Sequence, residues 1–235
     1  MKARYLLVVP ALLSLTGCVI DGSHGGSVQY SSESVEMDDS EVVRVELRMG
    51  AGDLRVTDGA AKLMRADFAY SVPSWKPEVR YSRSGKQAAL TVEQPGKNHT
   101  TLGNMKYSWD LQLNKKVPVD LALHFGAGQA RLDLGSLDLR GVELEMGVGQ
   151  MDVDLRGAPK HSYNVGIHGG IGQATVRLLA DTPVYVEAHG GIGSIQVRGL
   201  QQEDGHWVSP SFDRAENKIR IEINGGIGEI KVVAD

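Results

Sequence analysis

The sequence predicts an all-β protein built as a single β-solenoid, and three observations lead to this fold class. A Gly-x-Gly motif recurs six times, apolar residues alternate with polar ones on both sides of each motif, and no comparable helical stripe follows the first 17 residues. Alternation with a period of two is typical of strands that bury one face. A unit this short cannot bury its apolar face alone, so we expect neighbouring units to stack.

The six units share one pattern of a strand, a glycine turn and a second strand. The motifs are "MGAGDLRV" at Met49, "FGAGQARL" at Phe125, "MGVGQMDV" at Met146, "GGIGQATV" at Gly169, "GGIGSIQV" at Gly190 and "GGIGEIKV" at Gly225. Their first glycines are separated by 76, 21, 23, 21 and 35 residues, which indicates a repeat of about 21 residues with two insertions. Apolar residues stand five and three positions before each first glycine, and four and six positions after it.

The paired glycines are predicted to be structural turn residues. A sharp corner needs backbone conformations that are accessible only without a Cβ. A dinucleotide site would need a third glycine and a following helix, and a lipase-type "HGG" would need a G-x-S-x-G motif, which the sequence lacks. The predicted turn residues are Gly50, Gly52, Gly126, Gly128, Gly147, Gly149, Gly170, Gly172, Gly191, Gly193, Gly226 and Gly228.

The N-terminus predicts a secretory signal and a lipid anchor. Two basic residues precede the mostly apolar run Tyr5–Leu15, which is too short to span a bilayer. The following "LTGC" matches the bacterial lipobox, in which the cysteine is lipidated and the chain is cut just before it. We expect a lipoprotein signal peptide over 1–17, a lipidated Cys18 that anchors the protein in the membrane, and a flexible tether over 18–40. An ordinary signal peptide with a chance cysteine is the alternative.

Charge and cysteine content limit the partners and the compartment. The chain carries a formal net charge of −4, and loss of Lys2 and Arg4 with the signal peptide leaves −6. A mildly acidic chain without a basic run is a poor nucleic-acid binder, so no nucleic-acid partner is expected. Cys18 is the only cysteine, which excludes an intramolecular disulfide and a thiolate metal cage. Val19 after the cysteine favours the outer membrane by the sorting rule of enteric bacteria.

The two insertions divide the mature chain into an N-terminal portion over 41–120 and solenoid repeats over 121–235. The first insertion is expected to form an antiparallel cap with Trp75 and Trp109 in its core, or with one of them as a sugar-binding platform. The second insertion, Gln201–Lys218, is a candidate binding loop in which Trp207 either contacts a ligand or anchors the loop. The C-terminal unit is expected to be the last coil, covered by a loop or by a second copy in a homo-oligomer.

Two outward columns of polar residues accompany the motifs, the first a candidate for binding and the second a structural feature. Stacked strands lie about 4.8 Å apart, so residues two positions before each first glycine would adjoin one another. This makes His124, Glu145, His168, His189 candidate binding residues, either as a zinc-type cluster or as a pH-sensitive column. Because such residues stand in a line, a solvated polar ladder is the simpler interpretation, and we expect no metal and no cofactor. A second column contains three glutamines that are expected to form an amide ladder.

Five stretches of the sequence carry a resemblance to a known family. They are "VRVELRMGAGDLRV", "YSVPSWKPEVRYS", "LTVEQPG", "WDLQLNKKVPVDLALHFGAGQARLDLGSLDLRGVELEMGVGQMDVDL" and "IEINGGIGEIKV". Over residues 41–233 the chain thereby resembles the toast-rack family of bacterial envelope proteins. The resemblance implies a stacked β-solenoid, related to domains named as adhesins and to sensory domains of envelope-stress systems. It implies no catalytic residues.

We therefore predict a lipid-anchored, extracytoplasmic and non-catalytic envelope protein that acts as an adhesin-like or scaffold binding module. Its partner would be an envelope protein or a glycan. A carbohydrate-active enzyme on the same scaffold is one alternative, because β-solenoid enzymes use paired carboxylates, here Glu143 with Glu145 or Asp152 with Asp154. An envelope-stress sensing accessory of a membrane complex is the other.

Overall fold

The computed structural model describes residues 27–96 and 105–235, so the predicted signal peptide and Cys18 lie outside the described residues. The described residues form one 13-stranded sheet, and their only helical segments are two 3-10 turns, Pro73–Trp75 (η1) and Phe212–Arg214 (η2). The all-β class is confirmed. No helix among the described residues is long and apolar enough to cross a membrane.

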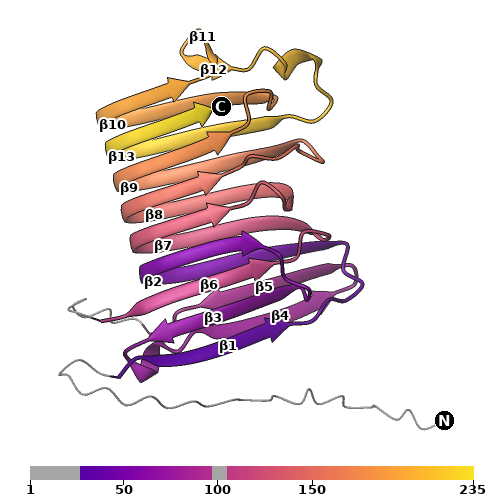
Figure 1. Cartoon of the computed structure of the whole chain (residues 1–235), viewed down its shortest axis with the longest axis vertical. Helices are drawn as coiled ribbons and strands as arrows, with labels where there is room; N and C mark the ends of the chain where they lie inside the picture. Colours follow the sequence, from indigo (N-terminus) through magenta and orange to yellow (C-terminus); the bar gives the residue numbers. More distant parts are fainter. Residues whose placement is uncertain (1–26, 97–104) are drawn as a thin grey trace.

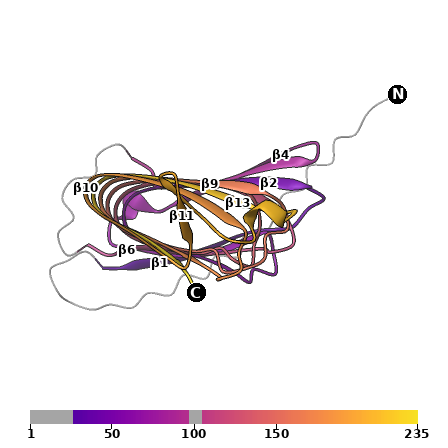
Figure 2. The ribbon, with the colours of Figure 1, turned by 90° about the horizontal axis from the view of Figure 1, so that it is seen from above.

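Six long strands form the body of the molecule, and each carries one Gly-x-Gly motif near its middle. At the motif each strand bends back, so that the strands superimpose as flattened U shapes when they are seen from above (Figure 2). Neighbouring U shapes pair in parallel along both arms, with glycines aligned on glycines. The long strands are β2 (Val42–Asp58), β7 (Pro118–Asp133), β8 (Asp138–Asp154), β9 (Tyr163–Leu178), β10 (Val184–Arg198) and β13 (Ile219–Ala234).

The apolar core lies between the two arms. Residues five positions before each first glycine are at most 2% exposed in all six strands, and those three positions before it are buried as well. Burial of each fully buried aliphatic side chain stabilises the folded state by about 1.5–3 kcal/mol. The alternation seen in the sequence therefore records which side of each arm faces the opposite arm.

The order of the strands in space differs from their order in the sequence. The stack runs β2-β7-β8-β9-β13-β10, so the C-terminal strand lies between β9 and β10 (Figure 1). The prediction that the C-terminal unit is the last coil is wrong. Lys231, in this C-terminal strand, pairs in register with Thr175 on one side and Gln196 on the other. The last coil is β10.

At the β2 end of the stack, shorter strands continue both arms. Along one arm β5 (Gln87–Glu93) pairs in parallel with β2 and antiparallel with β4 (Glu78–Ser84). Along the other, β6 (Tyr107–Leu113) pairs in parallel with β2 and antiparallel with β3 (Met64–Tyr70). Trp75 and Trp109 are buried and both contact the ring of Tyr107 edge-on, so both belong to the core and neither offers a sugar-binding face.

The first described strand corrects the predicted tether over 18–40. Gln29–Val35 forms β1, which pairs antiparallel with β3 from Gln29 opposite Tyr70 to Val35 opposite Met64. Its sequence, "QYSSESV", is polar enough to resemble a linker, because an edge strand here has most of its side chains in solvent. Backbone pairing and the bond from Ser32 Oγ to Asp67 Oδ1, 2.5 Å long, hold it to β3.

The second insertion packs back on the end of the stack. It contains β11 (Gln201–Glu203), β12 (His206–Val208) and η2, and β12 pairs with the start of β10 at Tyr185 and Val186. Trp207 is half-buried against the core, and the ring of His206 stacks on that of Tyr185 with centroids 4.5 Å apart. Trp207 therefore anchors this loop to β10.

Candidate binding surface at the glycine bends

The close stacking of the bends requires both glycines of the motif in β7, β8, β9, β13 and β10. Gly149, the second glycine of its motif, has a φ of +136°, a conformation that residues with a Cβ rarely adopt. A Cβ at Gly149 would overlap the carbonyl oxygen of Gly128 in the neighbouring strand, and one at Gly147 would lie 2.5 Å from that of Gly126. The recurring "HGGIG" therefore lies at a bend where the backbones of adjacent strands stack directly.

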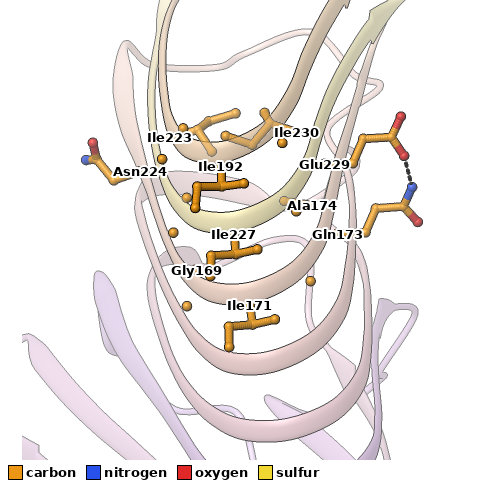
Figure 3. Close-up of a pocket in the computed structure, with 18 of the residues that line it drawn as sticks. Gly169, Ile171, Gln173, Ala174, Ile192, Ile223, Asn224, Ile227, Glu229 and Ile230 are labelled. Atoms are coloured by element: carbon orange, nitrogen blue, oxygen red, sulfur yellow. Dashed lines mark hydrogen bonds between the residues drawn. The ribbon is translucent and has the colours of Figure 1, made fainter.

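The residue between the two glycines forms an exposed apolar column. Val148, Ile171 and Ile227 are each 50% exposed, and Ile192 is 71% exposed. Each of the four pairs in register with the next, and Figure 3 shows the three isoleucines at successive bends. We call these four residues the bend ridge. Sequence reasoning missed the ridge because it treated the motif only as a turn, although alanine suffices at the same position in β2 and β7.

The predicted histidine column lies on one side of the ridge. Its residues follow the spatial order of the strands, which differs from their order in the sequence. His124 lies between two carboxylates, with its Nδ1 2.8 Å from Glu145 Oε2 and its Nε2 3.6 Å from Glu46 Oε1. A hydrogen bond from Arg48 lowers the pKa of Glu46 and favours its carboxylate form.

The predicted contact between His168 and His189 is wrong. The insertion of β13 places Asn224 opposite each of them, so the two imidazoles lie two strands apart. Asn224 itself donates a hydrogen bond to Glu222 within its own strand. In the part of the chain that the structure describes, no three His, Cys, Asp or Glu side chains are grouped to hold a metal ion.

The other side of the ridge carries the predicted amide ladder. Gln129 Nε2 donates to Gln150 Oε1 and Gln150 Nε2 donates to Gln173 Oε1, both over 3.3 Å. Gln173 in turn donates to Glu229, which also accepts a 2.9 Å bond from Gln196 Nε2. The amides of Gln129, Gln150 and Gln173 therefore point in one direction and end on Glu229 of β13, which accepts the bond of Gln196 from the opposite side, from β10.

Three of the four carboxylates of the enzyme alternative, those of Asp152, Asp154 and Glu145, lie against basic side chains. Asp154 Oδ2 lies 2.6 Å from Arg156 Nη2, and this hydrogen bond holds the pKa of Asp154 below its usual range. Asp152 lies 3.5 Å from Arg177, and Glu145 lies against His124. A general acid needs a raised pKa, so Asp154 has the opposite of what that role requires.

The three columns together make a surface with an apolar centre and polar borders. Protein interfaces have this arrangement, with apolar side chains at the centre and hydrogen-bonding groups at the rim. The bend ridge supplies the centre, and the histidine column and the amide ladder supply the borders.

A family model described as the N-terminal domain of toast-rack matches residues 24–177, which is more than half of the chain. The chain belongs to the toast-rack family. The family predicted from the sequence is thereby confirmed. No curated protein matches this toast-rack chain.

Two solved structures are similar to the toast-rack chain to different degrees. A "putative cell adhesion protein" from Clostridium sporogenes ATCC 15579 is 31% identical, with a TM-score of 0.86 over 89% of this chain and 100% of the other. A "putative adhesin" from Bacteroides fragilis NCTC 9343 is 11% identical, with a TM-score of 0.33 over 88% of this chain and 97% of the other. The first therefore shares both sequence and architecture with this chain.

Proposed function

We propose that this toast-rack protein is a non-catalytic, adhesin-like binding module of the cell envelope, anchored by a lipidated Cys18, and that the bend ridge is its contact surface for another protein. The observation that carries the proposal is the column of four exposed apolar side chains in register. The stack of bent strands then serves as a β-solenoid scaffold, capped at the β2 end by the shorter strands.

The ridge is unusual for a surface that meets only water. Single exposed apolar residues are normal on soluble proteins, whereas contiguous apolar patches mark interaction sites. Four stacked side chains make a line about 14 Å long at the usual strand spacing. The glycines on either side have no side chains, so a partner can approach the backbone closely around each ridge residue.

The position of the ridge fits a surface protein that reaches away from its anchor. The N-terminal strand β1 lies at one end of the stack and β10 at the other (Figure 1). The ten residues 19–28 between Cys18 and β1 span at most about 35 Å. With Cys18 in a membrane, the β1 end would face the lipid surface, and Ile192, the most exposed ridge residue, would lie at the distal end.

The similarity to a named cell adhesion protein supports the same function class. That relative shares 31% of its residues with this chain and aligns over its whole length. Adhesion needs a stable scaffold with a repetitive outer surface and requires no catalytic group, which agrees with the ion-paired state of Asp152 and Asp154.

The test is photo-cross-linking in intact cells. A photo-reactive amino acid replaces Ile171 or Ile192 on the ridge, and Lys115, exposed in the turn between β6 and β7, serves as the matched control. We expect a discrete protein adduct from the ridge positions and none from Lys115, identified by mass spectrometry. Adducts only with glycan, or equal adducts from all three positions, would contradict the proposal. A membrane kinase or channel as the sole partner would favour the stress-sensing alternative.

A further inference from the structure

The bends of β8, β9, β13 and β10 border a cavity of about 230 Å³. Its walls are mainly apolar side chains, among them the ridge residues Ile171, Ile192 and Ile227, and glycine backbone. Four polar residues also line it: Gln173, Ser194, Asn224 and Glu229. Figure 3 shows Ile223 and Ile230 on its upper wall with Gly169 and Ala174 below them. The cavity lies at the end of the core where the two arms of each U shape meet.

The cavity arises from a change in the repeat. The residue before the first glycine and the fourth residue after it meet inside each bend: a Cβ on Gly225 would lie 3.0 Å from Ile230 Cδ1, and one on Gly190 3.5 Å from Ile195 Cδ1. In the first three units the residue before the first glycine is large and fills the bend, as Met49 with Leu54, Phe125 with Ala130, and Met146 with Met151.

In β9 both members of the pair are small. The residues are Gly169 and Ala174, and a Cβ built on Gly169 would have no atom within 4 Å. Gly169 has no positive φ, so its backbone conformation does not demand glycine. The two strands beyond it, β13 and β10, also have glycine at this position, so three successive bends lack the side chain that fills the first three.

The cavity can be reached from the β10 end of the stack. The β12 strand covers β10 only at Tyr185 and Val186, whereas residues 190–195 of β10 are exposed. Ile195, which borders the cavity, is 37% exposed although it occupies a core position of the repeat. A ligand that passed Ile195 would meet Ile223 and Ile230 of β13 and then Ala174 of β9.

We propose that this cavity is a binding site for a small apolar ligand, either a compact hydrocarbon or the end of an alkyl chain. An apolar cavity of about 150 Å³ lined by Leu, Ile and Phe stays dry and takes up benzene. The cavity described here is larger, isoleucine side chains supply most of its apolar wall, and a well-packed core has few voids of this size. The ligand chemistry follows from the walls, because the isoleucine side chains offer dispersion contacts and no hydrogen bonds.

The test is an NMR titration of the isoleucine δ-methyl groups with benzene and, separately, with octanoate. The protein is the full chain with Cys18→Ser, which would not be lipidated and so needs no detergent that could enter the cavity. We expect saturable shifts at Ile195, Ile223 and Ile230 with at least one probe. A response to benzene assigns the site to compact molecules, and a response to octanoate assigns it to alkyl chains.

A second variant separates binding from general surface effects. Gly169→Met with Ala174→Met gives β9 the same pair as β8, and should raise the Tm and abolish the saturable shifts. Leu111→Met, a volume-conserving change in the distant strand β6, is the control and should leave them intact. The proposal is overturned if neither probe gives saturable shifts, or if the shifts persist in the filled variant. Should the double variant misfold, Ala174→Met alone provides the same comparison.

Discussion

Gly149 shows how closely the backbones of this fold approach each other. Its φ of +136° and the carbonyl of Gly128 against its Cα leave no room for a methyl group. The same relation recurs along the column of second glycines, so each bend depends on the bend before it. We therefore expect the addition of a single methyl group to lower the stability of the fold most at the bends.

We expect Gly149→Ala to lower the free energy of unfolding by more than the backbone strain alone, which is about 1–3 kcal/mol. The excess comes from overlap with the carbonyl oxygen of Gly128. Gly85→Ala is the matched control, because Gly85 also has a positive φ but a Cβ there would meet no atom within 4 Å. Urea unfolding measures both variants. Equal losses would show that stacking at the bend does not require glycine.

Asp154 gives a pH-dependent prediction. The bond from Arg156 lowers its folded pKa below the unfolded value of about 3.9, so its carboxylate stabilises the native state at neutral pH. This contribution is lost as the pH falls through the folded pKa. Neighbouring Asp133, whose pKa is raised by burial and then by the charge of Asp154, offsets part of it.

Asp154→Asn should therefore lower the free energy of unfolding at pH 7 by less than about 1 kcal/mol. The difference from the native protein should shrink at an acidic pH below the folded pKa of Asp154, where the protonated side chain is uncharged like that of Asn. Urea unfolding at the two pH values measures it. A gap of the same size at both values would show that the ion pair with Arg156 contributes nothing.

At the scale of elements, the position of β13 reverses the expectation that chain ends are loosely held. β13 pairs along its whole length with β9 on one side and with β10 on the other. β10 pairs with β13 on one side and, beyond Val186, has no strand on its other side among the described residues. Protection of backbone amides follows pairing and burial rather than distance from the terminus.

Hydrogen exchange should therefore be slower in β13 than in the second arm of β10. We expect amides of residues 219–234 to remain protected longer than those of residues 190–198, measured by mass spectrometry on peptides from the two strands. The opposite ranking would contradict the order β9-β13-β10.

The strands themselves could be predicted from the sequence better than the order in which they pair. The inward positions could be predicted because burial of one face imposes a period of two. The positions of Val45 and Leu47 are apolar and buried in every unit. The place of β13 could not, because every unit has the same pattern and fits beside any other. β1 was missed because Ser and Glu dominate its sequence. It is held by backbone pairing with β3, which does not require an apolar side-chain pattern.

The candidate site was predicted in part. His124 and Glu145 do adjoin, as their repeat positions imply, and the three glutamines form their ladder. His168 and His189 do not adjoin, because that prediction depended on sequence order. The ridge was visible as β-branched residues between glycines, but only the exposure of Ile171 and Ile192 shows that they lie on the surface.

At the scale of the whole molecule, the proposed attachment to the membrane depends on one residue, Cys18. We expect Cys18→Ser to shift the protein from the membrane fraction to the soluble extracytoplasmic fraction, because two or more acyl chains are needed for stable anchoring. Fractionation followed by immunoblotting measures the change, and mass spectrometry of the native protein should show the added lipid mass. Retention of the variant in the membrane would mean that another part of the chain holds it there.

The interior position of the C-terminal strand also governs how the molecule can assemble. A chain is made from its N-terminus, so β9 and β10 exist before β13, and both carry the sequence His-Gly-Gly-Ile-Gly in matching register. Because β9 and β10 share this motif, we expect direct pairing of β9 with β10 to compete with the native order, and that premature closure would leave β13 without a place. Long-range strand pairing of this kind is slow and prone to kinetic traps. The last 17 residues of the chain therefore decide whether the stack closes correctly.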